Sequence, residues 1–305
     1  MTLDILCLGE PLLEFNQQPD GTYLPGHGGD TSNAAVSAAR QGAKVGYFTH
    51  VGDDTFGNSF MDLWAREGID TSTVRRVGDA HTGVYFVTHG AGGHAFSYFR
   101  AGSASSRVGP EDLPIEALKA TKILHVSGIG MAISDTAADA VFEAIRIVKE
   151  AGGMVSFDTN LRLKLWPIER ARATIHAAMA QCDIALPGMD DAMHLTGLDD
   201  PVEIVDFYRD LGAKIVALTM GAKGTLTTTG NDRRLVPAQK VQAVDATGAG
   251  DTFDGAFLAR IVAGDSPFEA TRYANAAAAL STQGYGAVAP MPRQHAVEQS
   301  LAAKA

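Results

Sequence analysis

Residues 245–258 read Asp-Ala-Thr-Gly-Ala-Gly-Asp-Thr-Phe-Asp-Gly-Ala-Phe-Leu, a glycine loop that runs directly into a helical pattern. Small residues let a backbone approach a ligand closely, and the amides at a helix N-terminus attract phosphate oxygens. We therefore interpret Gly248, Ala249 and Gly250 as an anion-binding turn, with Asp251 facing an attacking hydroxyl. The segment alone equally allows Asp251 to be only a stabilising charge at a helix N-terminus.

Outward from this loop, short apolar runs alternate with helical patterns, which predicts an α/β fold with a mainly parallel sheet. We expect strands at residues 5–8, 45–51, 123–126, 154–157, 184–186 and 215–218. Helices are expected at residues 31–40, 56–67, 135–149, 202–211, 251–262 and 267–282.

One region breaks the alternation of strands and helices. Residues 83–87 and 95–100 are two β-like runs joined by His-Gly-Ala-Gly-Gly-His at 89–94, which indicates a hairpin. A hairpin does not belong inside a parallel sheet. Together with the Gly- and Pro-rich residues 19–29, it predicts a small second sheet that projects as a lid over a site.

Composition and charge exclude several classes of protein. A formal net charge of -10 without a basic run argues against nucleic acid and anionic membranes as partners. Cys7 and Cys182 lack metal or CxxC spacing and are expected to be buried, reduced thiols. The apolar run at the N-terminus is too short for a signal peptide, and residues 273–292 are too polar for a membrane span, so we expect a cytoplasmic protein.

Common catalytic motifs are missing from the sequence. It contains no GxxxxGK[ST], HExxH or GxSxG pattern, and Gly128-Ile129-Gly130 is followed by Ile133 where GxGxxG needs glycine. P-loop, zinc-protease, serine-hydrolase and dinucleotide chemistry therefore lose support.

Two motifs together are recognisable. Residues 245–253 resemble the C-terminal signature of the ribokinase-like (pfkB) carbohydrate kinases, and residues 28–35 with 52–57 resemble the N-terminal one. Thr219-Met220-Gly221-Ala222-Lys223-Gly224 lies between them as a nucleotide loop. The resemblance implies one kinase domain over residues 1–305, with a three-layer α/β/α core and a β lid from about residues 11–30 and 76–101.

The resemblance also implies an activity, transfer of a phosphoryl group from ATP to a sugar hydroxyl, and roles for individual residues. Asp251 corresponds to the catalytic base, and the amides of Gly248, Ala249, Gly250 and Asp251 to the anion hole. The residues implied for the sugar are Gly29, Asp30, Thr31, Ser32, Asn33, Tyr85, Tyr98, Arg100 and Arg162. Those implied for the nucleotide are Asn160, Arg162, Thr219, Gly221, Ala222, Lys223, Gly224 and the 248–250 turn.

Magnesium is implied by the nucleotide, and potassium near Asp245 by the family. The family's N-x-x-E motif, which organises magnesium through water, is changed here, because Gly188 replaces Asn and Asp191 replaces Glu. This departure puts a metal role for Asp190 or Asp191 in doubt.

The substrate is predicted from arginines. Tyr98 and Arg100 share one face of a β-like run, because side chains alternate along a strand, and Arg162 follows another strand. Two arginines can clamp a carboxylate. Segments 9–12, 97–106, 157–162 and 165–167 resemble the 2-keto-3-deoxygluconate kinases, which implies a sugar acid as substrate.

Other interpretations stay open at this point. The two arginines can instead serve lid packing or ATP phosphates. A neutral-sugar or nucleoside kinase, such as a fructokinase or ribokinase, and a sensor that lost turnover are the alternative functions. Exposed lid edges favour a homodimer.

Overall fold

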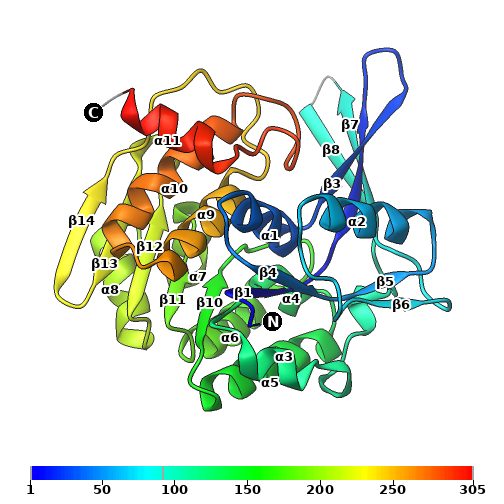
Figure 1. The fold of residues 1–305 in the computed structure, drawn as a ribbon, viewed down its shortest axis with the longest axis horizontal. Coiled ribbons are helices and arrows are strands. Elements are labelled where there is room, and N and C mark those ends of the chain that lie inside the picture. The colour runs from blue at the N-terminus through cyan, green and yellow to red at the C-terminus, as the bar shows by residue number, and fades with distance from the viewer. Residues whose placement is uncertain (1, 91–92, 304–305) are drawn as a thin grey trace.

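A large sheet with helices on both faces and a smaller sheet beside it make up the computed structural model, which describes residues 2–90 and 93–303 (Figure 1). The large sheet has the strand order β14-β13-β12-β11-β10-β9-β1-β4. Its strands are β1 (Ile5–Leu8), β4 (Val45–Phe48), β9 (Ile123–Ser127), β10 (Met154–Asp158), β11 (Ile184–Leu186), β12 (Ile215–Thr219), β13 (Thr225–Thr229) and β14 (Asp232–Val236). All pairs from β4 to β12 are parallel, while β13 and β14 extend the sheet antiparallel. The predicted α/β class with a mainly parallel sheet is confirmed.

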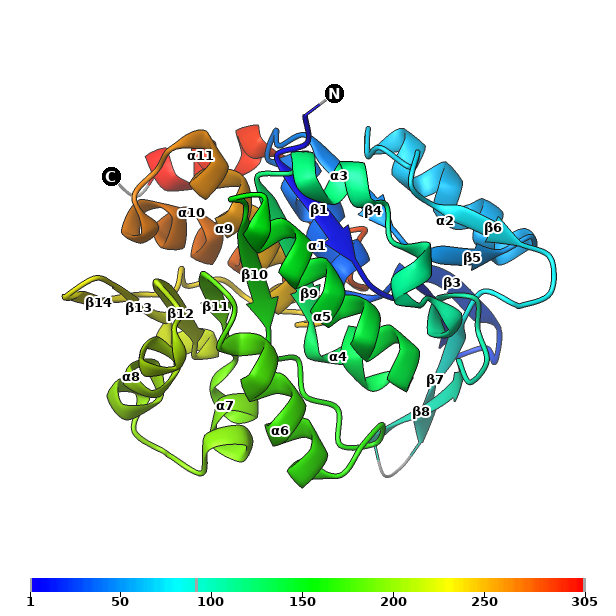
Figure 2. The same cartoon turned by 90° about the horizontal axis from the view of Figure 1, so that it is seen from below.

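Helices cover both faces because the parallel strands are apolar on both. β1 reads Ile-Leu-Cys-Leu and is buried at every position, as expected for a strand with helices above and below. In Figure 2, α4, α5 and α6 lie on one face and α1, α9 and α10 on the other, and a separate buried apolar cluster fills each side. The helices are α1 (Asp30–Arg40), α2 (Thr55–Arg66), α3 (Ile115–Ala120), α4 (Gly128–Ala132), α5 (Asp135–Glu150), α6 (Ile168–Met179), α7 (Met189–Thr196), α8 (Pro201–Leu211), α9 (Ala249–Ala263), α10 (Pro267–Ser281) and α11 (Gln294–Ala302). None of the helices in the described part of the chain has the length and hydropathy of a membrane span.

The smaller sheet has the order β3-β2-β7-β8 and projects from one end of the large sheet (Figure 1). Its strands are β2 (Leu12–Gln17), β3 (Tyr23–Gly28), β7 (Val84–Gly90) and β8 (Gly93–Phe99). β7 and β8 form the predicted hairpin, with Val84 opposite Phe99. Ala91 and Gly92, in the predicted connection, lie outside the described residues. A separate smaller sheet, predicted from the break in the strand and helix pattern, is confirmed.

The single strand predicted over residues 45–51 is wrong, because the structure divides it. β4 belongs to the large sheet, whereas β5 (His50–Gly52) pairs in parallel with β6 (Arg75–Val77) in a third, two-stranded sheet. The Arg75 N–H donates to the carbonyl of Thr49 at 3.1 Å, which draws the chain away from β1 at that point. An apolar run does not indicate where a strand ends and the next one pairs with a different neighbour, so periodicity alone predicts one strand.

Close packing of α1 against α9 brings the two signature motifs together. Gly255, in the middle of α9, lies so near α1 that a β-carbon there would sit 2.2 Å from the carbonyl oxygen of Ala34 and 2.5 Å from the β-carbon of Ser37. The Ser37 hydroxyl also donates to the carbonyl of Thr252 at 2.7 Å. Only glycine allows this approach.

Replacing Gly255 should therefore push the two helices apart. We expect Gly255→Ala to lower the free energy of unfolding by about 1–3 kcal/mol, the usual range for overpacking a core, as measured by equilibrium urea denaturation. Gly78→Ala is the matched control, because a β-carbon at that position would have no other atom within 4 Å. Equal stability of the two variants would contradict the packing argument.

Candidate active site

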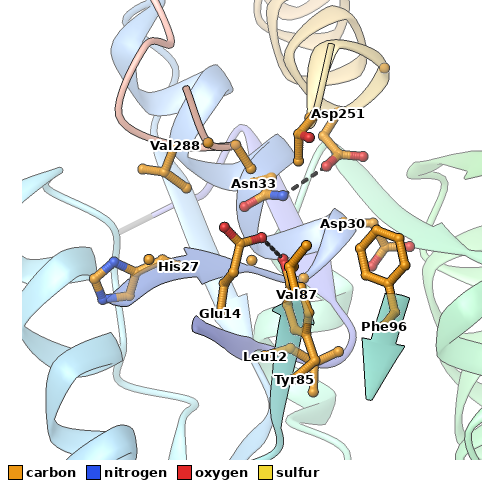
Figure 3. Close-up of a pocket in the computed structure, with 18 of the residues that line it drawn as sticks. Leu12, Glu14, His27, Asp30, Asn33, Tyr85, Val87, Phe96, Asp251 and Val288 are labelled. Atoms are coloured by element: carbon orange, nitrogen blue, oxygen red, sulfur yellow. Dashed lines mark hydrogen bonds between the residues drawn. The ribbon is translucent and has the colours of Figure 1, made fainter. Parts of the chain in front are cut away.

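A cavity of about 1990 Å³ lies between the smaller sheet and the carboxyl ends of the parallel strands. Ligands of open α/β sheets bind at this edge. A pocket for one small molecule typically measures about 300–1,000 Å³, so the cavity has room for two ligands side by side. Figure 3 shows part of its lining, with side chains from the smaller sheet facing those from α1 and α9.

Asp251 and Asn33 meet at the centre of this cavity, as a consequence of the α1–α9 packing. The Asn33 Nδ2 donates to the Asp251 Oδ2 at 2.8 Å (Figure 3). Burial and the negative charge of Asp30 raise the pKa of Asp251 to about 7, although the Asn33 hydrogen bond and the charge of Arg162 act to lower it. The Asn33 Oδ1 is buried and has no partner among the described residues. The pair presents a proton acceptor and an unused hydrogen-bond acceptor to a ligand.

Three helices begin after a glycine at this cavity, and none of the three has a side-chain cap. The N-cap residues are Gly29 of α1, Gly188 of α7 and Gly248 of α9, and all three line the cavity. The amides of a first helical turn have no partner within the helix, and the helix dipole adds positive potential there. Uncapped helix ends therefore add positive potential to this cavity wall, beside cationic side chains such as Arg162.

The predicted anion-binding turn packs closely against Ala287 at Gly248 and is open at Gly250. Gly248 has φ 73°, and a β-carbon there would lie 2.9 Å from that of Ala287. A β-carbon at Gly250, by contrast, would have no other atom within 4 Å. The Ala249 N–H donates to the carbonyl of Ala246 at 3.1 Å in this structure, so the amides of Gly250 and Asp251 are the ones at the open end of the helix.

Asp30 is held by its neighbours at the start of α1. It accepts from the Thr31 N–H at 2.8 Å and from the Asn160 Nδ2 at 3.0 Å. Gly29 has φ 97°, and a β-carbon there would overlap the carbonyl oxygen of Glu10 at 2.3 Å. Gly29 and Asp30 thus lie in the cavity wall, where sugar contacts were predicted.

The side chains of Thr31 and Ser32 do not face the cavity, contrary to their predicted contact with sugar. The Thr31 hydroxyl lies 3.0 Å from that of Tyr47, and the Ser32 hydroxyl accepts from the indole of Trp64 at 3.0 Å. Both residues are fully buried against the large sheet and α2. Within the first turn of α1, Asp30 and Asn33, three positions apart and therefore on one face of the helix, line the cavity, whereas Thr31 and Ser32 do not.

The smaller sheet contributes acidic as well as aromatic groups. Tyr85 and Tyr98 stack with ring centroids 5.6 Å apart, and both line the cavity. The Tyr85 hydroxyl donates to Glu14, on the neighbouring strand β2 (Figure 3). The sequence interpretation did not include Glu14, although its place between Leu12 and Asn16 on one face of an apolar run is a usable signal.

Arg100 is paired with a buried acid. Its guanidinium forms an ion pair with Glu10, whose side chain has no exposed surface, and the Ser103 hydroxyl also donates to Glu10. The Arg100 Nε is buried without a hydrogen-bond partner among the described residues. Glu10 was not predicted, and it cancels the charge for which Arg100 was singled out.

Arg162 lies on the opposite wall and is exposed. It donates to the carbonyl of Leu161 at 2.8 Å. Burial raises the pKa values of both Asp251 and Asp191, and the charge of Arg162 partly opposes that rise. No acidic partner within 4.0 Å is seen for it among residues 2–90 and 93–303. Arg162 is therefore the more available of the two predicted arginines.

The predicted nucleotide loop follows β12. Thr219 lines the cavity, while Gly221, Ala222 and Lys223 form a 3-10 turn beyond it, η3 (Gly221–Lys223). Gly224 has φ 97°, and a β-carbon there would collide with the carbonyl of Val236 at 2.2 Å. The loop is thus anchored to β14.

The residues considered for metals are engaged with the backbone. Asp191 accepts from the Leu161 N–H at 2.8 Å, and burial raises its pKa. Asp190 is exposed, and its carbonyl contacts His194. Asp245 accepts from the Thr247 and Gly286 N–H groups, both at 2.9 Å. In the described part of the chain, no group of three or more His, Cys, Asp or Glu side chains could hold a metal ion.

Comparisons with known proteins agree with this geometry. A 2-dehydro-3-deoxygluconokinase of Thermoproteus tenax is 34% identical, over 96% of this chain and 93% of that protein. Fructokinase-1 of Zea mays is 32% identical over 97% of both. A putative ribokinase II of E. coli, solved in complex with ATP and Mg²⁺, superposes with a TM-score of 0.91 at 27% identity, covering 99% of each chain.

The profile of the pfkB family carbohydrate kinases matches residues 6–294, nearly the whole chain. With Asp251 at an open helix end in a two-ligand cavity, the chain therefore belongs to the pfkB family and is a carbohydrate kinase.

Proposed function

We propose that this enzyme phosphorylates the terminal hydroxyl of a sugar acid, 2-keto-3-deoxygluconate, with ATP as the donor and Asp251 as the base. The observation that carries the reaction is Asp251 itself, held by Asn33 at the open end of α9 with a pKa near neutrality. The Thermoproteus relative acts on the proposed substrate by its name, and the E. coli structure contains the proposed donor and Mg²⁺.

The proposed step needs little from the protein beyond placement and charge. As the sugar oxygen bonds to phosphorus and the bond to the β-phosphate breaks, Asp251 accepts the hydroxyl proton. The 248–251 turn stabilises the transferred oxygens through its amides and the dipole of α9. Asn33 holds the carboxylate toward the hydroxyl.

The sugar is proposed to lie beneath the smaller sheet, which acts as a lid within a single domain of residues 1–305. Residues 11–30 and 76–101 form this lid. Gly29, Asp30 and Asn33 form the floor of the sugar site, and Tyr85 and Tyr98 its roof. Glu14, buried beside Tyr85, adds an acceptor for a sugar hydroxyl.

Arg162 is the main support for a sugar acid. It is exposed toward the cavity, and a guanidinium binds a carboxylate through two parallel hydrogen bonds. Arg100 has its charge balanced by Glu10 and keeps its Nε as a donor. This same pairing favours the second candidate function, a kinase of a neutral sugar such as fructose.

The remaining assignments concern the nucleotide, and they are also proposals. ATP lies along Thr219 and the 221–224 loop, with Asn160 and Arg162 at the boundary between nucleotide and sugar. Bound Mg²⁺ would neutralise the phosphate charge. Because Gly188 has no side chain and Asp191 is tied to Leu161, the phosphates would supply most ligands, with Asp191 reached through water. Potassium is proposed near Asp245.

The free, buried thiols Cys7 and Cys182 agree with a reducing compartment, and a cytoplasmic location is part of the proposal.

A homodimer that forms through the lid is a further part of the proposal. The face of the smaller sheet away from the cavity carries Phe15, Tyr23, Phe86 and Phe99 in mutual ring contacts. Phe99 is 59% exposed and Tyr23 40%. An exposed aromatic surface on a sheet is a usual site of association.

Replacing Asp251 by Asn should lower kcat by about 10²–10⁴-fold, because the hydroxyl loses its proton acceptor. The assay is coupled ADP release over sugar acids, neutral sugars and nucleosides. Wild-type kcat/KM should rise with pH through about 7, since the base works only when ionised. The exposed Asp199→Asn is the control. Turnover by Asp251→Asn at the wild-type rate would refute the assignment, and wild-type binding without ADP release would indicate a sensor.

Replacing Arg162 by Ala should lower kcat/KM for 2-keto-3-deoxygluconate about 10–100-fold more than for fructose, because only the sugar acid would lose a charge-assisted hydrogen bond. Arg162 is the better probe, because Arg100→Ala would leave Glu10 buried without its partner. Arg162→Lys keeps the charge and should recover part of the loss. Equal losses on both substrates would remove the carboxylate clamp and favour a role at the ATP phosphates.

Light scattering should give a mass near twice 32.0 kDa, and Phe99→Glu should give the monomer, because a charge would be buried in the contact. Phe99 does not line the cavity. A wild-type mass of one chain at micromolar concentration would rule the dimer out.

A further inference from the structure

The cavity wall that carries Asp251 also holds a pair of carboxyl groups, Asp158 and Asp254, that the proposed reaction does not use. Asp254 is one helical turn beyond Asp251 on α9, so both side chains point from the same face. Asp158 is the last residue of β10. Asp254 is 3% exposed, and its carboxyl group is hydrogen-bonded to that of Asp158.

Two carboxyl groups in hydrogen-bond contact share a proton, because two negative charges at that distance repel strongly away from water. Burial raises the pKa values of both Asp158 and Asp254, and the charges of Asp30 and Asp251 raise them further. At neutral pH the pair therefore keeps one proton and carries one negative charge.

The hydrogen bond from Asn160 favours a carboxylate on Asp158 and the proton on Asp254. The backbone N–H of Asn160 donates to the Asp158 Oδ1 at 3.1 Å, which stabilises a carboxylate on Asp158. The bond from Asp158 raises the pKa of Asp254. Asp254 is thus the acid that donates, and Asp158 the carboxylate that accepts twice.

This arrangement holds a strained residue of the site. Asn160 has φ 26°, a value that non-glycine residues rarely adopt. It is kept there from two sides, by Asp158 at its N–H and by Asp30 at its side-chain amide. Asp30 in turn begins α1, which carries Asn33. The pair thus connects α9 to α1 behind the reacting groups.

Other charged or titratable groups also face this cluster. Asp191 of α7 adds negative potential at Asp158, while Arg162 lowers the pKa values of Asp251 and Asp191. Tyr85 faces Asp251, and burial raises its pKa. Behind Asp30, the thiol of Cys7 and the hydroxyl of Tyr47 also have raised pKa values, so both are neutral. Each additional negative charge here would oppose ionisation of Asp251.

We propose that Asp254 is a positioning residue that donates its carboxyl proton to Asp158 and thereby limits the negative charge beside Asp251. This role rests on the proposed function of Asp251 as base. A second ionised carboxylate near Asp251 would keep Asp251 protonated up to a higher pH. Fewer enzyme molecules would then carry the ionised base.

The first test needs no turnover. Infrared spectra of the ligand-free protein at pH 8 should show a protonated-carboxyl C=O stretch that Asp254→Asn lacks. The same signal should persist in Asp251→Asn, which separates it from the base. Retention of the full signal in Asp254→Asn would show that Asp254 is ionised, and would overturn the proposal even if the enzyme acts on a different sugar.

The second test uses the pH dependence of kcat/KM. In Asp254→Asn the amide donates to ionised Asp158, the charge of the pair is unchanged, and the acid limb should keep its wild-type position. In Asp158→Asn/Asp254→Asn the pair is neutral, and the limb should move down by about one pH unit. An acid limb at the wild-type pH in the double variant would refute the electrostatic role. Thermal unfolding of both variants checks that they are folded.

Discussion

The contact of α1 with α9 at Gly255 is the constraint on which the site depends. It places two uncapped helix N-termini side by side and sets Asn33 2.8 Å from Asp251. Neither helix alone would form the site, because the Asp251 carboxyl group lies on α9 and its hydrogen-bond donor, Asn33, lies on α1. The large sheet is the platform that holds both helices with their N-termini at its carboxyl edge.

The charges of the site explain how an acidic protein can bind an anionic donor. The chain has a net charge of -10, and Asp30, Asp158, Asp251 and Asp254 cluster around the reacting position. Local features can offset this charge: the amides of open helix ends, the charge of Arg162, and, in our proposal, a proton shared between Asp158 and Asp254. Helix ends are fixed dipoles that need no counter-ion, so they can face phosphate without neutralising Asp251.

The sequence was sufficient to predict the parallel core, the smaller sheet and the Asp251 turn, because each depends on local pattern or a contiguous motif. It was not sufficient for contacts between distant residues. Glu10 and Arg100 are 90 positions apart, and Asp158 and Asp254 belong to different elements, so no spacing rule relates them. Thr31 and Ser32 show a further limit, since a motif names a segment while helical geometry decides which side chains face the ligand.

The groups proposed for the reaction and those proposed for the sugar come from overlapping but different parts of this architecture. Asp251, Asn33 and the 248–251 turn belong to the core, whose packing tolerates little change, as Gly255 shows. Glu14, Tyr85, Tyr98 and Arg100 belong to the smaller sheet, which is joined to the core largely through its base, where Arg100 pairs with Glu10. Under the proposed function, a substitution on that sheet would alter the contacts to the sugar without moving Asp251. Relatives named for a sugar acid and for fructose are 34% and 32% identical to this chain over nearly its whole length, so overall similarity does not separate the two substrates. The proposed discrimination depends on single groups from both layers, Arg162 after β10 and Tyr98 and Arg100 at the smaller sheet.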